Sequence, residues 1–289
     1  MEIVRSVRWK FRSKEGKWFQ WALVLLMAFL LFTALNATGV LSLPALQVEQ
    51  WLLLRPQTRL DCIFYEWRNL GNAGFSMFFT LILGTTCVCI GYRKRVLPLM
   101  LLLLVLGVGA EIVGKSLFYQ PLPYTLGSGM ITLTCPQMYG QPGAVRLATG
   151  LGIWGKIPRP SLHAQIWAQS VSKMPLVIDA GSSENSYPSG HAIRWIFIGL
   201  VLAWLFWRHV APGRVRLLLV IFALIIAFAG GFMQFYVGVH FITDTLAGYL
   251  LGAATACCAI GILRLNEPPQ AIGRLSNEYR RNEIISRRC

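Results

Sequence analysis

The segment Tyr187-Pro188-Ser189-Gly190-His191 precedes a long apolar stretch, and the chain is predicted to fold around it. It places a small hydroxyl, a glycine and an imidazole where an apolar helix is expected to begin. A helix start favours anions because its first backbone N–H groups are unpaired and its dipole is positive there. Gly190 would let an anion approach the backbone closely. The segment therefore predicts a phosphate-binding site at the start of a helix.

A second motif lies about fifty residues further on, at His240-Phe241-Ile242-Thr243-Asp244, where another apolar segment starts. Residues four apart share one face of a helix, so Asp244 can hold one ring nitrogen of His240. The other nitrogen would then be free to attack phosphorus or to move a proton. Together the two motifs predict a site that cleaves phosphoesters.

These motifs resemble the second and third signatures of the type 2 phosphatidic acid phosphatase (PAP2) superfamily. The family pattern is Lys-x6-Arg-Pro, then Pro-Ser-Gly-His, then Ser-Arg-x5-His-x3-Asp. Two positions depart from it: Leu122 replaces the arginine of the first signature, which keeps Lys115 and Pro123, and Gln234 replaces the arginine of the third. The resemblance covers roughly residues 115–252.

The resemblance implies a role for each matching residue. His240 would be the nucleophile that forms a phosphohistidine, Asp244 would orient it, and His191 would protonate the leaving group. The phosphate would be held by Lys115, Ser189 and the N–H of Gly190. No metal or cofactor is expected, and the seven cysteines show no Cys-x-x-Cys spacing that would suggest a metal site.

Other side chains are candidates to replace the missing positive charge. Arg194 is a permanent cation inside an apolar helix, where a charge costs about 2.5–3.5 kcal/mol to insert. Either it pairs with Glu111 inside another apolar segment, or it contacts the phosphate in place of a lost arginine. Further donors to the phosphate are predicted from two loop residues and a neutral amide: Lys156, Arg159 and Gln234.

Composition indicates a membrane protein. Of 289 residues 55% are hydrophobic and only 13% are charged, and the mean hydropathy is +0.54, whereas soluble domains are about 25% charged. Six apolar segments are long enough to span a bilayer, so we expect an all-α integral membrane protein with a PAP2-like bundle. The predicted spans are residues 21–41, 74–92, 96–114, 189–207, 217–235 and 241–263.

Charge patterning predicts the topology. The net charge of +15 comes mostly from short basic blocks between apolar segments, which argues for membrane orientation and against nucleic-acid binding. A basic arm (1–18) would contact anionic lipid at the inner surface, followed by the membrane domain (19–264) and a basic cytoplasmic tail (265–289). Both termini would then be cytoplasmic, with Lys115, His191 and His240 on the outer face of the plasma (inner) membrane.

Two stretches between the spans carry further expectations. Residues 118–187 are rich in glycine and proline and are expected to form a lid or substrate-selecting loop, with short helices near 143–153 and 161–172. Residues 42–73 are expected to lie on the outer membrane surface. Cys62 and Cys135 would both be in outer loops and could form a disulfide if that side is oxidising. Nothing in the sequence indicates the oligomeric state.

The function predicted from these features is hydrolysis of a lipid phosphate or diphosphate. Two alternatives stay open. Fewer cations suit a smaller charge, so the protein could be a phosphotransferase that acts on a phosphodiester and passes the group to an alcohol. It could also be a catalytically silent homologue that binds a phospholipid, although both histidines and Asp244 argue against this.

Overall fold

The computed structural model describes residues 16–53, 63–64, 67–118, 120 and 186–267. These residues form seven α-helices and one 3-10 turn, with no β-strand among them. Several predicted features lie outside the described residues: Leu122, Lys156 and Arg159, the Cys62–Cys135 disulfide, the short helices near 143–153 and 161–172, and most of the basic arm and tail.

Within the described residues, six helices are long and apolar enough to cross a membrane, as the sequence predicts. They are α2 (Gly16–Ala37), α5 (Ala73–Ile90), α6 (Val96–Leu117), α9 (Gly190–His209), α10 (Arg214–Tyr236) and α11 (Ile242–Leu265). Most begin and end within three residues of the predicted bounds. The first begins five residues earlier, because Gly16 to Gln20 continue the helix into the basic segment.

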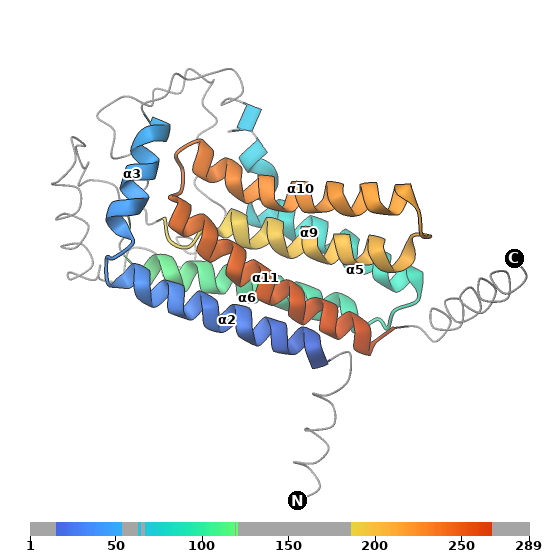
Figure 1. The fold of residues 1–289 in the computed structure, drawn as a ribbon. Coiled ribbons are helices and arrows are strands. Elements are labelled where there is room, and N and C mark those ends of the chain that lie inside the picture. Colours follow the sequence, from blue (N-terminus) through green and yellow to red (C-terminus); the bar gives the residue numbers. More distant parts are fainter. Residues whose placement is uncertain (1–15, 54–62, 65–66, 119, 121–185, 268–289) are drawn as a thin grey trace, which may run out of the picture.

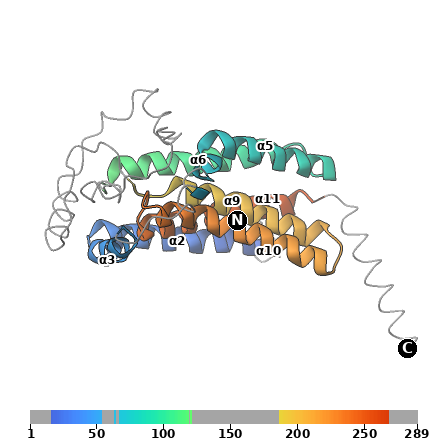
Figure 2. The ribbon, with the colours of Figure 1, turned by 90° about the horizontal axis from the view of Figure 1, so that it is seen from above.

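Helices α9 and α11 form the centre of the bundle. Helix α10 packs on α9, α2 packs on α11, and α5 and α6 lie side by side over the central pair (Figures 1 and 2). The surrounding helices expose large apolar side chains that suit contact with lipid tails, including Leu23, Met27, Phe78, Leu102 and Phe222.

The two central helices approach each other closely through Gly248 and Gly252. A Cβ atom would lie 2.5 Å from the carbonyl oxygen of Ser189 at the first position, and 2.5 Å from that of Ile193 at the second. Any larger residue would therefore push the backbones apart. The spacing of the two glycines, Gly-x3-Gly, is one that close contacts between membrane helices commonly use.

The starts of α9 and α11 and the ends of α6 and α10 gather at one end of the bundle, beside α3 (Ser42–Leu53) (Figure 1). Helix α3 and the turn η1 (Arg68–Gly71) belong to the stretch predicted to lie on the membrane surface. Helix α3 packs against α11 and buries Ala45, Leu46 and Glu49. It therefore covers the end of the bundle at which the signature motifs meet.

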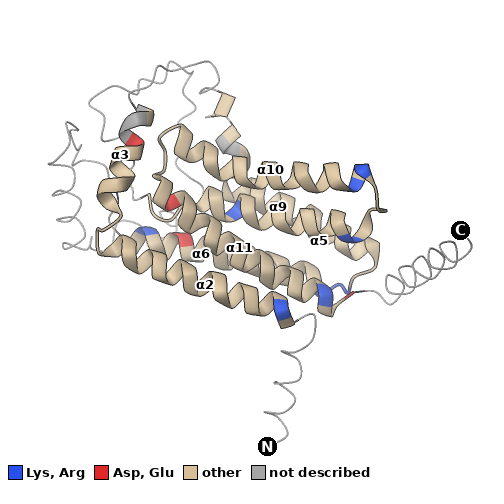
Figure 3. Cartoon of the chain, viewed as in Figure 1, with Lys and Arg blue, Asp and Glu red and all other residues tan. Residues whose placement is uncertain are grey.

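The opposite end of the bundle is basic. Lys and Arg residues gather where α9, α5 and α11 end and where α2, α6 and α10 begin (Figure 3). There Arg208 pairs with Glu267, with Nε 2.6 Å from Oε1. The charged residues that lie within the helices, away from the basic end, are found closer to the other end of the bundle, near α3 (Figure 3).

Candidate active site

The two signature motifs meet through the backbone. Ser189 caps α9, and its hydroxyl oxygen accepts the N–H of Ala192 at 3.5 Å. The N–H of Ser189 itself donates to the carbonyl of Asp244 at 3.1 Å. His191, in the first turn of α9, is buried. The Pro-Ser-Gly-His segment and the start of α11 therefore form one unit.

His240 lies in the tight turn between α10 and α11. The carbonyl oxygen of Gln234 accepts the N–H of Val239 at 2.9 Å and that of His240 at 3.1 Å. Gly238 in this turn has φ 73°, a left-handed conformation that glycine adopts without strain. The end of α10 thus fixes the backbone position of His240.

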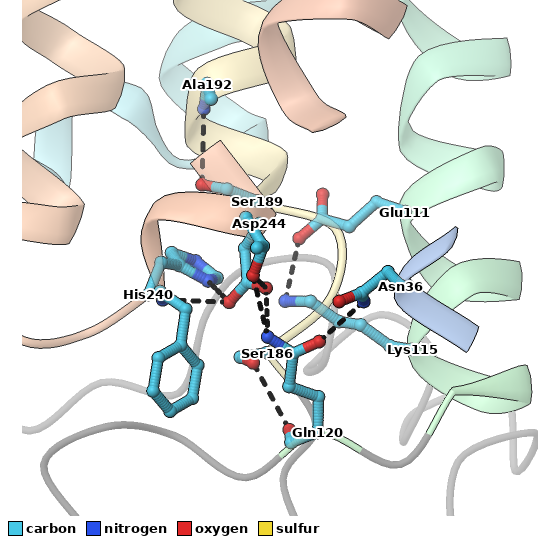
Figure 4. Close-up of polar contacts among 11 residues, drawn as sticks. Asn36, Glu111, Lys115, Gln120, Ser186, Ser189, Ala192, His240 and Asp244 are labelled. Atoms are coloured by element: carbon cyan, nitrogen blue, oxygen red, sulfur yellow. Dashed lines mark hydrogen bonds and ion pairs between the residues drawn. The ribbon is translucent and has the colours of Figure 1, made fainter. Parts of the chain in front are cut away.

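Asp244 is fully buried and holds the histidine from the first turn of α11 (Figure 4). Its Oδ2 accepts the backbone N–H of Phe241 at 3.0 Å and lies 3.5 Å from Nδ1 of His240. Its Oδ1 accepts a hydrogen bond from Nε2 of Gln120 at 2.5 Å. The carboxylate therefore faces Nδ1 of His240, which leaves Nε2 as the nitrogen available for chemistry.

The environment of His240 favours its neutral form. Burial lowers the pKa of His240 below its usual value, and it outweighs the opposing effect of Asp244, which raises the pKa. A neutral imidazole has a lone pair to offer as a nucleophile. The lowered pKa therefore favours the form of His240 that could act as a nucleophile.

Two buried cations share one buried carboxylate. Nζ of Lys115, in the last turn of α6, lies 3.0 Å from Oε1 of Glu111. Nη1 of Arg194 lies 2.5 Å from Oε2 of the same carboxylate, and its Nε donates to the carbonyl of Gly71 at 2.8 Å. This confirms the predicted pairing of Arg194 with Glu111. Contact between Arg194 and a phosphate stays a prediction.

Gly190 makes the predicted close approach possible. A Cβ atom at this position would overlap the carboxylate of Glu111, so that carboxylate lies directly against the start of α9. The anionic group that lies against this helix start is thus a side chain of the protein itself. In Figure 4 the side chains of Glu111, Lys115 and Asp244 gather in one region, whereas the hydroxyl of Ser189 points toward the N–H of Ala192.

A polar network behind Asp244 was not predicted. Gln120 follows the end of α6, and its amide oxygen accepts a hydrogen bond from Asn36 of α2 at 2.9 Å (Figure 4). The backbone N–H of Ser186 donates to the carbonyl of Gln120 at 2.8 Å. All three residues are buried. The sequence alone gives little indication of this network, because Gln120 is a single polar residue at the end of an apolar helix and its partners lie far from it along the chain.

Two other buried polar side chains belong to this end of the bundle. The side-chain amide of Gln234, where the family pattern has arginine, has no hydrogen-bond partner among the described residues. The same holds for the carboxylate of Glu49 in α3, whose pKa is raised well above its usual value by burial and by Asp244. Gln234 therefore stays a candidate ligand for substrate. No pattern in the sequence predicts that Glu49 lies at this end of the bundle.

Comparison with known proteins identifies the family. A model of the PAP2 superfamily matches residues 95–267, more than half of the chain and all three signature regions. This chain belongs to the PAP2 superfamily. The assignment from the motifs is thereby confirmed, and with it a multi-pass membrane protein from a family of lipid phosphatases.

One known sequence and one solved structure are similar to this chain. Phosphatidylglycerophosphatase B of Bacillus subtilis (strain 168) is 35% identical over 150 residues, which cover 50% of this chain and 67% of that protein. The crystal structure of a transmembrane PAP2-type phosphatidylglycerolphosphate phosphatase from Bacillus subtilis aligns with a TM-score of 0.52 and 20% identity, covering 86% of this chain and 98% of the other. The structural likeness shows a shared fold.

Proposed function

We propose that this protein hydrolyses a membrane lipid phosphate or diphosphate through a phosphohistidine on His240. The observation that carries the proposal is the arrangement of His240 and Asp244. Nδ1 of His240 faces the buried carboxylate of Asp244 at 3.5 Å, burial lowers the pKa of the imidazole and so favours its neutral form, and a helix start and a buried lysine lie nearby. This is the arrangement that covalent catalysis by histidine requires.

The reaction has two steps. Nε2 of His240 attacks phosphorus, the bond from phosphorus to the lipid oxygen breaks, and His191 donates a proton to that oxygen. Water then attacks the phosphohistidine, His191 takes its proton, and the P–N bond breaks to release phosphate and neutral His240. Lys115 and the first N–H groups of α9 would stabilise the charge on the non-bridging oxygens.

The substrate class follows from the setting. The site lies at one end of a bundle whose outer faces are apolar, so the reacting phosphate would be reached by a lipid whose tails stay in the bilayer. Both relatives are named for phosphatases of phosphatidylglycerol phosphate. That lipid is therefore the first substrate to test.

The charge of the site favours one second candidate. Glu111 offsets one of the two buried cations, Lys115 and Arg194, and Gln234 adds no charge. A site with little net positive charge suits the single charge of a phosphodiester better than the near-double charge of a monoester. The second candidate is therefore transfer of a phosphoryl-linked group from a diester to an alcohol.

One experiment separates these functions. The full chain, purified in detergent, is incubated with phosphatidylglycerol phosphate, phosphatidic acid or a prenyl diphosphate, with and without an added alcohol. We expect phosphate release in water, unchanged by a chelator and abolished in His240→Ala. Products only with the alcohol would favour transfer, whereas activity lost with chelator and restored by magnesium would contradict the mechanism.

A further inference from the structure

The carboxylate of Glu111 has the contacts that the substrate phosphate is expected to make. It lies against Gly190 at the start of α9, and it pairs with Lys115 at 3.0 Å and with Arg194 at 2.5 Å. The side chains of Glu111 and Arg194 are 1% exposed and that of Lys115 is 3% exposed. The two cations and the helix start together form an anion-binding site, and the carboxylate of Glu111 already occupies it.

Arg194 has a contact that would survive the loss of this carboxylate. Nε of Arg194 stays bound to the carbonyl of Gly71, and its Nη2 has no hydrogen-bond partner among the described residues. The guanidinium therefore keeps a fixed position and has an amino group to offer to a larger anion. Lys115 sits at the end of α6, where its flexible side chain can turn toward the bundle end.

We propose that Glu111 is an internal anion that occupies the phosphate subsite when no substrate is bound, and that a substrate phosphate displaces its carboxylate from Lys115 and Arg194. This inference rests on the proposed function for the position of the subsite. Glu111 would weaken binding of phosphate, including the product, because its charge competes for the same cations. Release of inorganic phosphate would be faster for that reason.

The competing account is that Glu111 only neutralises two buried cations and that phosphate binds elsewhere. Both accounts agree that removing the carboxylate costs stability, because it leaves the cations unpaired. The two accounts differ in the affinity for phosphate that they predict once the carboxylate is removed. Displacement predicts that substrate and inorganic phosphate both bind more tightly when the charge of Glu111 is removed, and by the same factor.

The test compares Glu111→Gln with wild type and with Glu267→Gln, which breaks the Arg208 pair at the opposite end of the bundle. Binding of inorganic phosphate to the full chain in detergent is measured by calorimetry. The KM for p-nitrophenyl phosphate and the inhibition constant of phosphate are measured alongside. For Glu111→Gln we expect all three constants to fall about tenfold or more, and for Glu267→Gln no change.

Unchanged or weaker phosphate binding in folded Glu111→Gln would overturn the proposal, and so would tighter binding with an unchanged KM. If Glu111→Gln does not fold, Glu111→Asp keeps the charge but shortens its reach by one methylene. It should also tighten phosphate binding, and an unchanged affinity would overturn the proposal. Calorimetry needs no turnover, so a protein without lipid phosphatase activity would refute the proposed function while still testing Glu111.

Discussion

Asp244 joins a helix start, a histidine and a glutamine through a single buried carboxylate. One oxygen closes the first turn of α11 through the N–H of Phe241 and faces Nδ1 of His240, and the other accepts from Gln120. The same side chain thus begins a helix and sets the orientation of the proposed nucleophile. At the residue scale, the proposed catalysis depends on which form of His240 this environment favours.

The pH dependence of turnover follows from the lowered pKa of His240. Attack requires neutral imidazole, so kcat/KM should fall as the pH drops through this pKa. Because burial lowers the pKa, the acid limb should lie below about 6.5, the ordinary value for histidine. In Asp244→Asn the group that raises the pKa is lost, so the limb should move to still lower pH while kcat falls about 10²- to 10⁴-fold.

A pH–rate profile of both proteins in one detergent checks this. A wild-type acid limb above the ordinary histidine value, or one that moves upward in Asp244→Asn, would contradict the assignment of His240 as the nucleophile.

At the scale of elements, the site depends on helices that contribute no reacting group. Asn36 in α2 holds Gln120, and Gln120 holds Asp244 of α11. In addition, the hydroxyl of Thr33 in α2 lies 2.7 Å from that of Tyr187, just before the Pro-Ser-Gly-His segment. Helix α2 therefore positions both signature motifs.

Replacing Asn36 by Ala should lower kcat about 10- to 100-fold with little change in KM, because Gln120 would lose its anchor and Asp244 its fixed orientation. Thr38→Ala is the matched control, since the Thr38 hydroxyl makes an exposed contact to the carbonyl of Leu35. Steady-state kinetics on detergent-purified protein measures both. A change confined to KM, or an equal loss in Thr38→Ala, would show that Asn36 does not act through Asp244.

The contact between α9 and α11 can be tested at Gly252. In Gly252→Ala the new methyl group would meet the carbonyl of Ile193, so the helices must separate, at a cost of about 1–3 kcal/mol. Gly109→Ala in α6 is the control, because a Cβ there would meet no atom of another helix within 4 Å, so the substitution should leave stability unchanged or slightly higher. Thermal unfolding in detergent compares them. Equal midpoints of thermal unfolding for Gly252→Ala and Gly109→Ala would mean that α9 and α11 do not need this close approach.

These elements differ in how far the sequence could predict them. The spans were predictable because a bilayer requires long apolar helices, and the His240–Asp244 contact was predictable because residues four apart share a helical face. The pairing of Arg194 with Glu111 could be proposed because a buried charge needs a partner. The link from Asn36 through Gln120 to Asp244 could not, since it joins residues 84 and 124 positions apart with no pattern between them.

The contact of Glu111 with Gly190 was equally hidden. It depends on how α6 is rotated against α9, which hydropathy does not specify. The Gln234 position shows the reverse case: a departure from the family pattern is visible in the sequence, but its consequence depends on how the side chain is buried.

At the scale of the whole molecule, the two ends of the bundle differ in charge. The basic end is expected in the cytoplasm and the end with His240 outside, because basic residues are retained on the inner side of a membrane. Cysteines introduced at Ala211, between α9 and α10, and at Val40, near the end of α2, report on the two ends, since both residues are exposed.

In intact cells a membrane-impermeant thiol reagent should label Val40→Cys above the background of the parent protein, and should label Ala211→Cys only after the membrane is opened. The reverse pattern would place the site on the cytoplasmic side and would contradict the proposed topology.

The central claim is that His240 becomes covalently phosphorylated, and direct detection of that intermediate tests it most closely. We expect His191→Ala, quenched during turnover of p-nitrophenyl phosphate, to carry phosphate on His240 by mass spectrometry, because this leaving group needs no proton but water still needs a base. His240→Ala should carry none. Turnover without a phosphorylated His240, or phosphate found on another residue, would contradict the account.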